Sequence, residues 1–447
     1  MQRFFKSIFK GDPVIWAFIF LAMAFSIVLI FSATSNFAFE SERTTGNFYG
    51  PIMAHVSHVL VALVVCLFGA RVHPKYFGKF VYIGLIIAFV LLLVTTLAGV
   101  DINNAKRWVS IFGVQFQPSE IVKLAVINYT AFQLGSSYYN SRRTFWMIFV
   151  PSIAAIGLIF WNNISTSMLL AMVVFLMCLT GGANRKMVSI VAITAVVSVV
   201  LGIIILMAIP KDMAHKIGGR ISTGKDRIEK FKEGRDSRVG DPNKTALENY
   251  IASLDLSDED TQVGYSHIAI ARGGLFGVGA GNSETRYMLP QPFSDFIYAI
   301  IAEEYGLVGC SLVVIAYLIL FFRIALIARK THSMYLKLLL MGIGYAIIIQ
   351  AFLNMAVASG LFPVTGQPLP FLSRGGTSYL ITSLYFAVLL SVTHHIRKER
   401  EKREAEILEA GGNTVVEVEA FPAVPEVDTE VYGEDGATPT WVESQSI

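Results

Sequence analysis

The chain has 447 residues, of which 54% are hydrophobic and 15% are charged, and its formal net charge is +3. A soluble domain carries roughly a quarter charged residues, so this composition argues against a soluble globular enzyme. The apolar residues gather in runs of about 17 to 25, the length that a helix needs to cross a bilayer. The composition therefore predicts an all-α polytopic membrane protein.

Ten apolar segments are expected to form transmembrane helices. They cover residues 14–35, 52–70, 79–98, 117–135, 145–161, 165–182, 187–209, 294–322, 334–358 and 376–396. The first run is too long for a cleaved signal peptide, so we expect it to be retained as a helix. An even number of crossings places both termini on the same side of the membrane.

The distribution of basic residues indicates on which side of the membrane the termini lie. The short loops that share a side with the termini hold 19 Lys and Arg residues. The short loops opposite hold only Arg43, Lys106, Arg107 and Arg374. By the positive-inside rule, both termini are predicted to be cytoplasmic.

Two segments outside the predicted helices differ in their charge. Residues 210–293 balance 12 Lys and Arg against 12 Asp and Glu, which favours a large solvated extracytoplasmic loop. Residues 394–447 hold five basic and 13 acidic residues, which predicts a disordered acidic cytoplasmic tail that binds other proteins. Residues 1–393 keep a basic excess that suits anionic lipid, and nucleic-acid binding is not implied.

A glycine-rich run lies near the end of the long loop. Gly273, Gly274, Gly277, Gly279 and Gly281 precede a stretch that is bounded by two prolines. Such a run has the composition of a loop whose backbone approaches a phosphate closely. A plain re-entrant turn is the equal alternative, and no predicted strand precedes the run to support a dinucleotide fold.

Five ionisable residues lie near helix starts rather than in loops. Glu120 and Lys123 begin the fourth helix, and Asp295, Glu303 and Glu304 begin the eighth. Charges in membrane segments are costly, so each is a candidate site residue. The structural alternatives are an i, i+3 ion pair for the first two, interhelical hydrogen bonds for the glutamates, and a helix cap for Asp295.

The spacing of candidate residues and the motifs present argue against several classes of enzyme and metal site. Asp295 and Glu303 are about 12 Å apart along a helix, which is wider than the carboxylate pair of a glycosidase. The sequence contains no serine-hydrolase, zinc-protease or P-loop motif, and His55 and His58 have no third ligand nearby. All three cysteines lie in apolar runs, so neither a disulfide framework nor a thiolate metal site is expected.

Three segments carry a family resemblance. They are KRWVSIFGVQFQPSEIVK (106–123), GGLFGVGAGNSETRYMLPQPFSDFIYAIIAEEYG (273–306) and GLFPVTGQPLPFLSRGGTS (360–378). In this order they resemble the signature regions of the SEDS family, the shape, elongation, division and sporulation proteins. The acidic signature and the compact length are more similar to the division members than to the elongation members.

The resemblance implies a fold, an activity and partners. The expected protein has ten transmembrane helices in the bacterial cytoplasmic membrane. It is expected to be a peptidoglycan glycosyltransferase that polymerises lipid II into glycan strands on the outer face, during septal wall synthesis. It would work with a class B penicillin-binding transpeptidase and other division proteins.

The resemblance also implies site residues. The family's essential aspartate matches Asp295, and its remaining signature positions match Arg107, Trp108, Gln117, Pro118, Ser119, Glu120 and Lys123. The sequence departs from the family at residues 162–167, where an expected acidic group is missing. It departs again at Gln291 and at Arg374, which adds an outer-face cation.

These residues suggest a mechanism and two alternatives. Asp295 is expected to act as the base, while Arg107, Lys123, Arg374 or a divalent cation, Mg²⁺ or Mn²⁺, steadies the lipid diphosphate. A lipid II flippase or a non-catalytic scaffold for the transpeptidase remains open, as does the elongation role. A flippase predicts ionisable groups along a continuous path through the bilayer, whereas here they cluster toward the outer helix ends.

Overall fold

The computed structural model describes residues 8–33, 49–102, 105–111, 114–135, 142–182, 189, 258–289, 293–374 and 376–409. Nine of the ten predicted apolar segments fall in these ranges, and each forms a helix. Apart from Ser189, the predicted helix 187–209 lies outside the described residues, as do loop residues 210–257 and the tail after residue 409.

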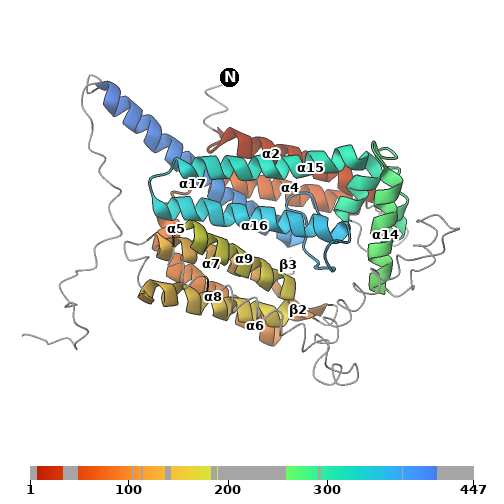
Figure 1. Ribbon diagram of the computed structural model, residues 1–447, viewed down its shortest axis with the longest axis horizontal. Helices are drawn as coiled ribbons and strands as arrows, with labels where there is room; N and C mark the ends of the chain where they lie inside the picture. Colours follow the sequence, from red (N-terminus) through yellow and green to blue (C-terminus); the bar gives the residue numbers. More distant parts are fainter. Residues whose placement is uncertain are drawn as a thin grey trace, which may run out of the picture.

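The long helices run side by side along the longest axis of the molecule (Figure 1). They are α2 (Pro13–Ala33), α4 (Gly50–Gly69), α6 (Val81–Ala98), α7 (Pro118–Leu134), α8 (Arg142–Asn162), α9 (Ile164–Thr180), α15 (Ile297–Arg329), α16 (Met334–Ala358) and α17 (Gly376–Glu409). Within the described residues, five helices are long and apolar enough to cross a membrane, and three shorter apolar helices accompany them. The chain therefore has a polytopic, mostly helical membrane fold.

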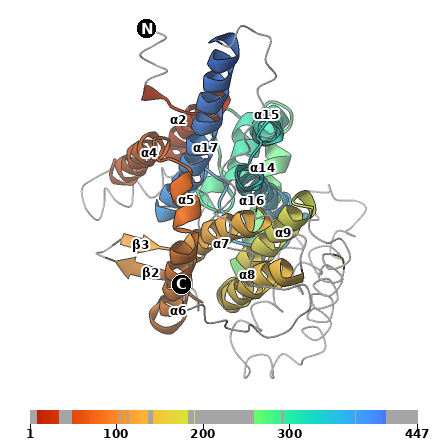
Figure 2. The ribbon, with the colours of Figure 1, turned by 90° about the vertical axis from the view of Figure 1, so that its left-hand side faces the viewer.

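Helix α16 forms the centre of the bundle. It packs against α15, α7 and α9. In its apolar 18-residue stretch, 72% of the residues are buried inside the protein, compared with 22% for α4. Figure 2 shows α17 between the α2–α4 pair and the α15–α16 pair. Large apolar side chains such as Leu21 and Leu97 are 72% and 79% exposed, which suits a surface that faces lipid rather than water.

Small residues let two of the helices approach closely. A Cβ atom added at Gly69 of α4 would lie 2.4 Å from the Cβ atom of Ala387 on α17. Close backbone approach at small residues is a common way for membrane helices to pack, because lipid offers no hydrophobic driving force between them. The three cysteines, Cys66, Cys178 and Cys310, are buried and free, as the apolar runs predicted.

The sequence predicted an all-α fold, but the structure also contains a small β-sheet. Between α6 and α7, three short antiparallel strands form a sheet in the order β1 (Val100–Ile102), β2 (Ala105–Ile111) and β3 (Val114–Phe116). The pairing shifts register between Val100 and Asp101, whose partners are Trp108 and Lys106. Position 107 is therefore the extra residue of a β-bulge.

Helix α15 is broken near its start by Gly306, which has φ 64° and ψ −162°. The amides of Val278 and Gly279 bond to the carbonyls of Glu303 and Glu304, over 2.9 and 3.0 Å. On the other side of the break, the amides of Leu307 and Val308 bond to the carbonyls of residues 274 and 275. The glycine-rich loop thus supplies the backbone partners that the break removes from the helix.

Two boundaries differ from the prediction. Helix α17 continues to Glu409, so residues 394–409 are helical and do not belong to a disordered tail. Three i, i+4 ion pairs support this extension: Arg397–Glu401, Arg400–Glu404 and Lys402–Glu406. The predicted solvated loop also contains a helix, α14 (Asp258–Gly273), which crosses one end of the bundle (Figure 1) and packs on α15.

Candidate functional site

Asp295 lies in a turn, residues 293–296, that directly precedes α15. The main-chain oxygens of this turn are bound in succession by another loop and by α16. The amide of Arg374 donates to Phe293 over 2.7 Å, and the hydroxyl of Ser373 donates to Ser294 over 2.6 Å. The side chain of Asn354 donates to the main-chain oxygen of Asp295 over 2.9 Å. These bonds fix the backbone that carries the carboxylate.

The Asp295 carboxylate is half-buried and does not cap the helix. Ser294 Oγ donates to Asp295 Oδ1 over 2.9 Å, and the N-cap position belongs to Phe296, without a side-chain cap. A Cβ atom added at Gly366 would lie 3.6 Å from Asp295 Oδ2. Asp295 therefore faces the loop that connects α16 to α17.

Neutral amide side chains connect this turn to the bundle. Asn354 also donates to the main-chain oxygen of Gln367 over 2.8 Å. Gln367 in turn donates to the hydroxyl of Thr166 over 2.9 Å, at the start of α9. Asn354 and Gln367 are 1% and 2% exposed, so the network lies in the protein interior. Such buried networks specify one arrangement of the elements that they join.

The predicted ion pair between Glu120 and Lys123 is confirmed. Lys123 Nζ lies 2.8 Å from Glu120 Oε2, and the two side chains are 1% and 10% exposed. Lys123 also donates to Gln350 Oε1 over 3.2 Å, and Gln350 donates to the main-chain oxygen of Pro368 over 3.0 Å. Because Gln350 and Asn354 are one turn apart on α16, the ion pair and Asp295 are joined through the same helix.

The neutral amides Gln350, Asn354 and Gln367 are not among the predicted site residues, because they carry no charge. A signal was present, because Gln350 and Asn354 lie at i, i+4 in an otherwise apolar segment, which places both on one face of a helix.

Two arginines, Arg374 and Arg107, were predicted to contact a phosphate. The Arg374 guanidinium is 5.1 Å from the centroid of the Phe293 ring, and burial lowers the pKa of Arg374. An arginine remains protonated even so, so a cation is held beside the Asp295 turn. Arg107 occupies the bulge in β2, and its side chain lies outside the described part of the structure. Its neighbour Trp108 pairs with Val100 and is half-buried.

The segment that lacks the family's acidic group still reaches the network. Asn163 is the N-cap of α9, and its side chain accepts a hydrogen bond from the Thr166 amide over 3.1 Å. The hydroxyl of Thr166 then accepts from Gln367. Neutral side chains therefore connect α9 to the loop beside Asp295.

The glycine candidates have a structural role in the described structure. Gly277 and Gly279 adopt φ 83° and 97°, and their amides donate to the carbonyls of Gly273 and Glu304. A Cβ atom at Gly277 would lie 2.2 Å from the Glu304 carbonyl oxygen. Close packing on the break in α15 accounts for Gly277, and the positive φ together with the bond to Glu304 accounts for Gly279. Their contact with a phosphate stays a prediction.

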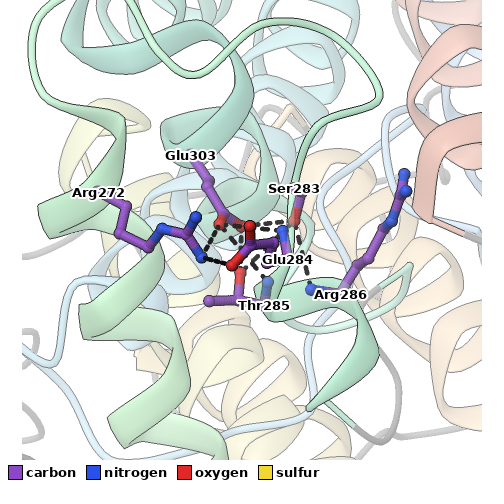
Figure 3. Close-up of polar contacts among 6 residues, drawn as sticks. All are labelled: Arg272, Ser283, Glu284, Thr285, Arg286 and Glu303. Atoms are coloured by element: carbon purple, nitrogen blue, oxygen red, sulfur yellow. Dashed lines mark hydrogen bonds and ion pairs between the residues drawn. The ribbon is translucent and has the colours of Figure 1, made fainter.

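Glu303 organises a polar cluster under the glycine loop (Figure 3). Its carboxylate accepts hydrogen bonds from the hydroxyls of Ser283 and Thr285 and from the amide of Glu284. Arg272 of α14 lies 3.7 Å from Glu303 Oε1 and 2.5 Å from Glu284 Oε2, and this contact lowers the pKa of Glu284. Glu303 thus holds a loop through hydrogen bonds, whereas the alternative expected hydrogen bonds between helices.

Glu304 joins the same region to the first helix. Its carboxylate accepts a hydrogen bond from Ser32, near the end of α2. Arg286 donates to the main-chain oxygen of Ser32 over 3.0 Å. The two glutamates therefore bind on different sides of α15, which explains how adjacent acids are both accommodated in the interior.

Few side chains in the described part of the structure are placed to bind a metal ion. No group of three or more His, Cys, Asp or Glu residues within the described ranges is placed to hold a metal ion. Mg²⁺ is commonly held by one or two carboxylates together with substrate phosphates. Asp295 with a lipid diphosphate would fit that pattern.

Known proteins share both the sequence and the fold. Residues 12–398 match the FtsW/RodA/SpoVE family, described as cell cycle proteins. The chain is 31% identical to a probable peptidoglycan glycosyltransferase FtsW of Enterococcus hirae, over 76% of this chain and 82% of that protein. It is similar in fold to a chain of a peptidoglycan synthase complex, with a TM-score of 0.61 and 19% identity, covering 86% of this chain and 97% of that one.

A second solved structure is the rod shape determining protein RodA of Thermus thermophilus. Its TM-score is 0.55 at 18% identity, and the match covers 86% of this chain and 97% of that chain. At this identity the likeness concerns the fold alone, whereas the sequence match spans nearly the whole membrane region. The chain belongs to the FtsW/RodA/SpoVE family of cell cycle proteins.

Proposed function

We propose that the chain is a peptidoglycan glycosyltransferase that polymerises lipid II on the outer face of the bacterial cytoplasmic membrane, in septal wall synthesis. The observation that carries this proposal is the position of Asp295. Its carboxylate is half-buried, and its backbone is held by Asn354, Ser373 and Arg374. A positioned carboxylate beside a held cation suits proton removal next to an anionic leaving group.

The reaction needs one base. Asp295 accepts the proton of the acceptor sugar's 4-hydroxyl as that oxygen bonds to the anomeric carbon of the donor. The bond from this carbon to the diphosphate oxygen breaks, and the polyprenyl diphosphate leaves with the electron pair. Attack from the opposite face inverts the anomeric centre. Because a diphosphate is a good leaving group, no second carboxylic acid is required, in contrast to a glycosidase.

The cations divide into two roles. Arg374 and Arg107 would contact the diphosphate, with Trp108 next to Arg107 in β2. Lys123 is 1% exposed and already contacts Glu120 and Gln350, which supports a positioning role for the Glu120–Lys123 pair. A divalent cation, Mg²⁺ or Mn²⁺, held by Asp295 and the phosphates would neutralise charge on the leaving group.

The setting of the enzyme follows from the basic loops and from its relatives. Both termini are proposed to be cytoplasmic, which places Asp295 outside, because Asp295 and the end of α17 lie at opposite ends of the bundle. A class B penicillin-binding transpeptidase is the proposed partner. The solved peptidoglycan synthase complex, which coordinates polymerisation and crosslinking, supports this pairing.

The test separates the transferase from the flippase and the scaffold. Purified chain in detergent micelles, where a flippase has no leaflets to connect, is given lipid II and assayed for glycan strands, with and without the transpeptidase. We expect polymer that Asp295→Asn abolishes and Arg107→Ala reduces strongly. Arg142→Ala with Arg143→Ala, on the predicted cytoplasmic side, is the matched control and should polymerise normally.

Two other outcomes would contradict the proposal. Absence of polymer even with the transpeptidase, together with lipid II movement across liposome membranes, would establish a flippase. Wild-type crosslinking by the transpeptidase partner, with no polymerisation by this chain under any condition, would establish a scaffold.

A further inference from the structure

A cavity lies at the end of the bundle that is remote from Asp295. It has a volume of about 800 Å³ and lies between the start of α2, the α15–α16 turn and the extension of α17. Figure 2 faces this end of the molecule. Because Asp295 precedes the first turn of α15 and the cavity borders its last turns, the length of α15 separates the two. The proposed chemistry therefore does not use this cavity.

The lining of the cavity is rich in cations. Five Lys and Arg residues line it against two acids, Asp12 and Glu399. The five are Arg323, Lys330, Arg397, Arg400 and Arg403. Asp12 forms an ion pair with Arg323, whose Nη2 atom lies 2.7 Å from Asp12 Oδ2. Glu399 contacts His395 over 3.0 Å. The lining thus carries more positive charge than its own acids neutralise.

Two of these cations lack an ion pair in the described structure. Lys330 and Arg403 have no Asp or Glu oxygen within salt-bridge distance among the described residues, whereas Arg397 and Arg400 pair along α17. The first turn of α16 also borders the cavity, and Ser333 caps that helix. A helix N-terminus adds a partial positive charge to this side of the cavity.

Apolar side chains contribute to the same lining. They are Pro13, Leu326, Ile327, Leu336 and Ile396. The turn between α15 and α16 lies where two apolar helices end, and hence near the boundary between hydrocarbon and water. A cavity near this boundary that is lined by both cations and apolar side chains matches an amphipathic anion rather than a free one.

We propose that this cavity binds the headgroup of an anionic glycerophospholipid, with the phosphate near Lys330 and Arg403 and the acyl chains against the apolar lining residues. Basic pockets between membrane helices are suited to such headgroups. A competing occupant is the chain's own segment 410–447, which contains eight acidic residues and no Lys or Arg. The apolar lining residues and the membrane-boundary position favour the lipid.

The experiment uses the full-length chain in detergent with equal amounts of phosphatidylglycerol and phosphatidylcholine, and native mass spectrometry counts the retained lipids. We expect the wild type to retain phosphatidylglycerol preferentially. The double variant Lys330→Gln, Arg403→Gln should bind it about 30-fold more weakly, since each basic residue near an anionic surface contributes about fivefold. The control Arg329→Gln, Lys402→Gln makes the same change in charge outside the cavity lining and should match the wild type.

Further measurements distinguish the lipid from other ligands of the cavity. Equal retention of both lipids, an equal loss in the control, or displacement by millimolar inorganic phosphate would overturn the proposal. A full-length variant with the acids of 410–447 replaced by their amides tests the tail. Phosphatidylglycerol retained only by that variant would assign the cavity to the tail, and unchanged retention would support the lipid. Thermal unfolding of each variant confirms that it is folded.

Discussion

Asn354 donates its side-chain amide to the main-chain oxygen of Asp295 over 2.9 Å, and the same amide donates to the main-chain oxygen of Gln367 over 2.8 Å. One side chain on the central helix thus binds both the turn that carries the proposed base and the loop that faces it. The backbone that carries the carboxylate is therefore held by α16 together with the loop after it, in addition to the helix that Asp295 precedes.

Asn354→Leu should therefore slow turnover without removing any group that contacts substrate. The leucine cannot donate, so two buried carbonyls lose a partner and the turn is free to shift. A displacement of about 1 Å costs about 10²-fold in rate, and we expect a loss of that order in kcat. Steady-state kinetics with lipid II should show little change in KM. A raised KM with normal kcat would show that Asn354 serves substrate binding instead.

Asp295→Asn should retain the fold and lose polymerisation. The amide keeps the shape of the side chain but cannot accept the proton, so we expect a loss of roughly 10² to 10⁴-fold. Glycan synthesis by the purified variant measures this effect, and its thermal unfolding temperature should stay close to that of the wild type. Glu284→Gln, an exposed acid of the same outer segment, is the matched control. Normal strand length and rate from Asp295→Asn would remove this residue from the mechanism.

The Glu120–Lys123 pair should behave as one unit in stability. Lys123→Met leaves a buried carboxylate without its cation, which costs about 3 to 5 kcal/mol. Adding Glu120→Gln should recover most of this loss but not the activity, because Gln350 has still lost its cationic partner. Thermal unfolding in detergent of the two single variants and the double variant gives the coupling free energy. Strictly additive effects would mean that the two side chains act independently.

Gly277→Ala should destabilise the outer end of α15. Its φ of 83° is unfavourable for alanine, and the added Cβ atom would lie 2.2 Å from a carbonyl oxygen. We expect a cost of at least about 2 kcal/mol, measured by thermal unfolding. Gly84→Ala is the control: Gly84 is helical with no atom within 4 Å of an added Cβ, so the same change there should stabilise α6 by about 0.5 to 1 kcal/mol. Equal effects at the two positions would argue against close packing at the break.

The helices were predictable because hydrophobic length is a strong signal, and α2 and α16 begin and end close to the expected residues. The pair of Glu120 and Lys123 was predictable from its i, i+3 spacing. The extension of α17 was missed because its charges suggested solvation, whereas alternating charges one turn apart also stabilise a helix.

The surroundings of Asp295 were less accessible to sequence analysis. The loop between α16 and α17 donates hydrogen bonds to the main-chain oxygens of residues 293 and 294, and backbone acceptors leave no trace in side-chain composition. The glycine run predicted either a phosphate contact or a plain re-entrant turn, and its bonds to the interrupted backbone of α15 could not be predicted from composition. Local patterns identified the charged residues, but the contacts between distant segments required the fold.

The break at Gly306 has a consequence for the order in which α15 is made. Residues 307–329 form an apolar stretch that can enter the bilayer as an ordinary helix, whereas the turns before Gly306 need bonds from residues 274–279. The outer turns and the glycine loop should therefore form together, after insertion. Hydrogen exchange provides a direct view: the amides of Val278, Gly279, Leu307 and Val308 should open in a single event, at a lower free energy than the amides of the membrane-crossing turns.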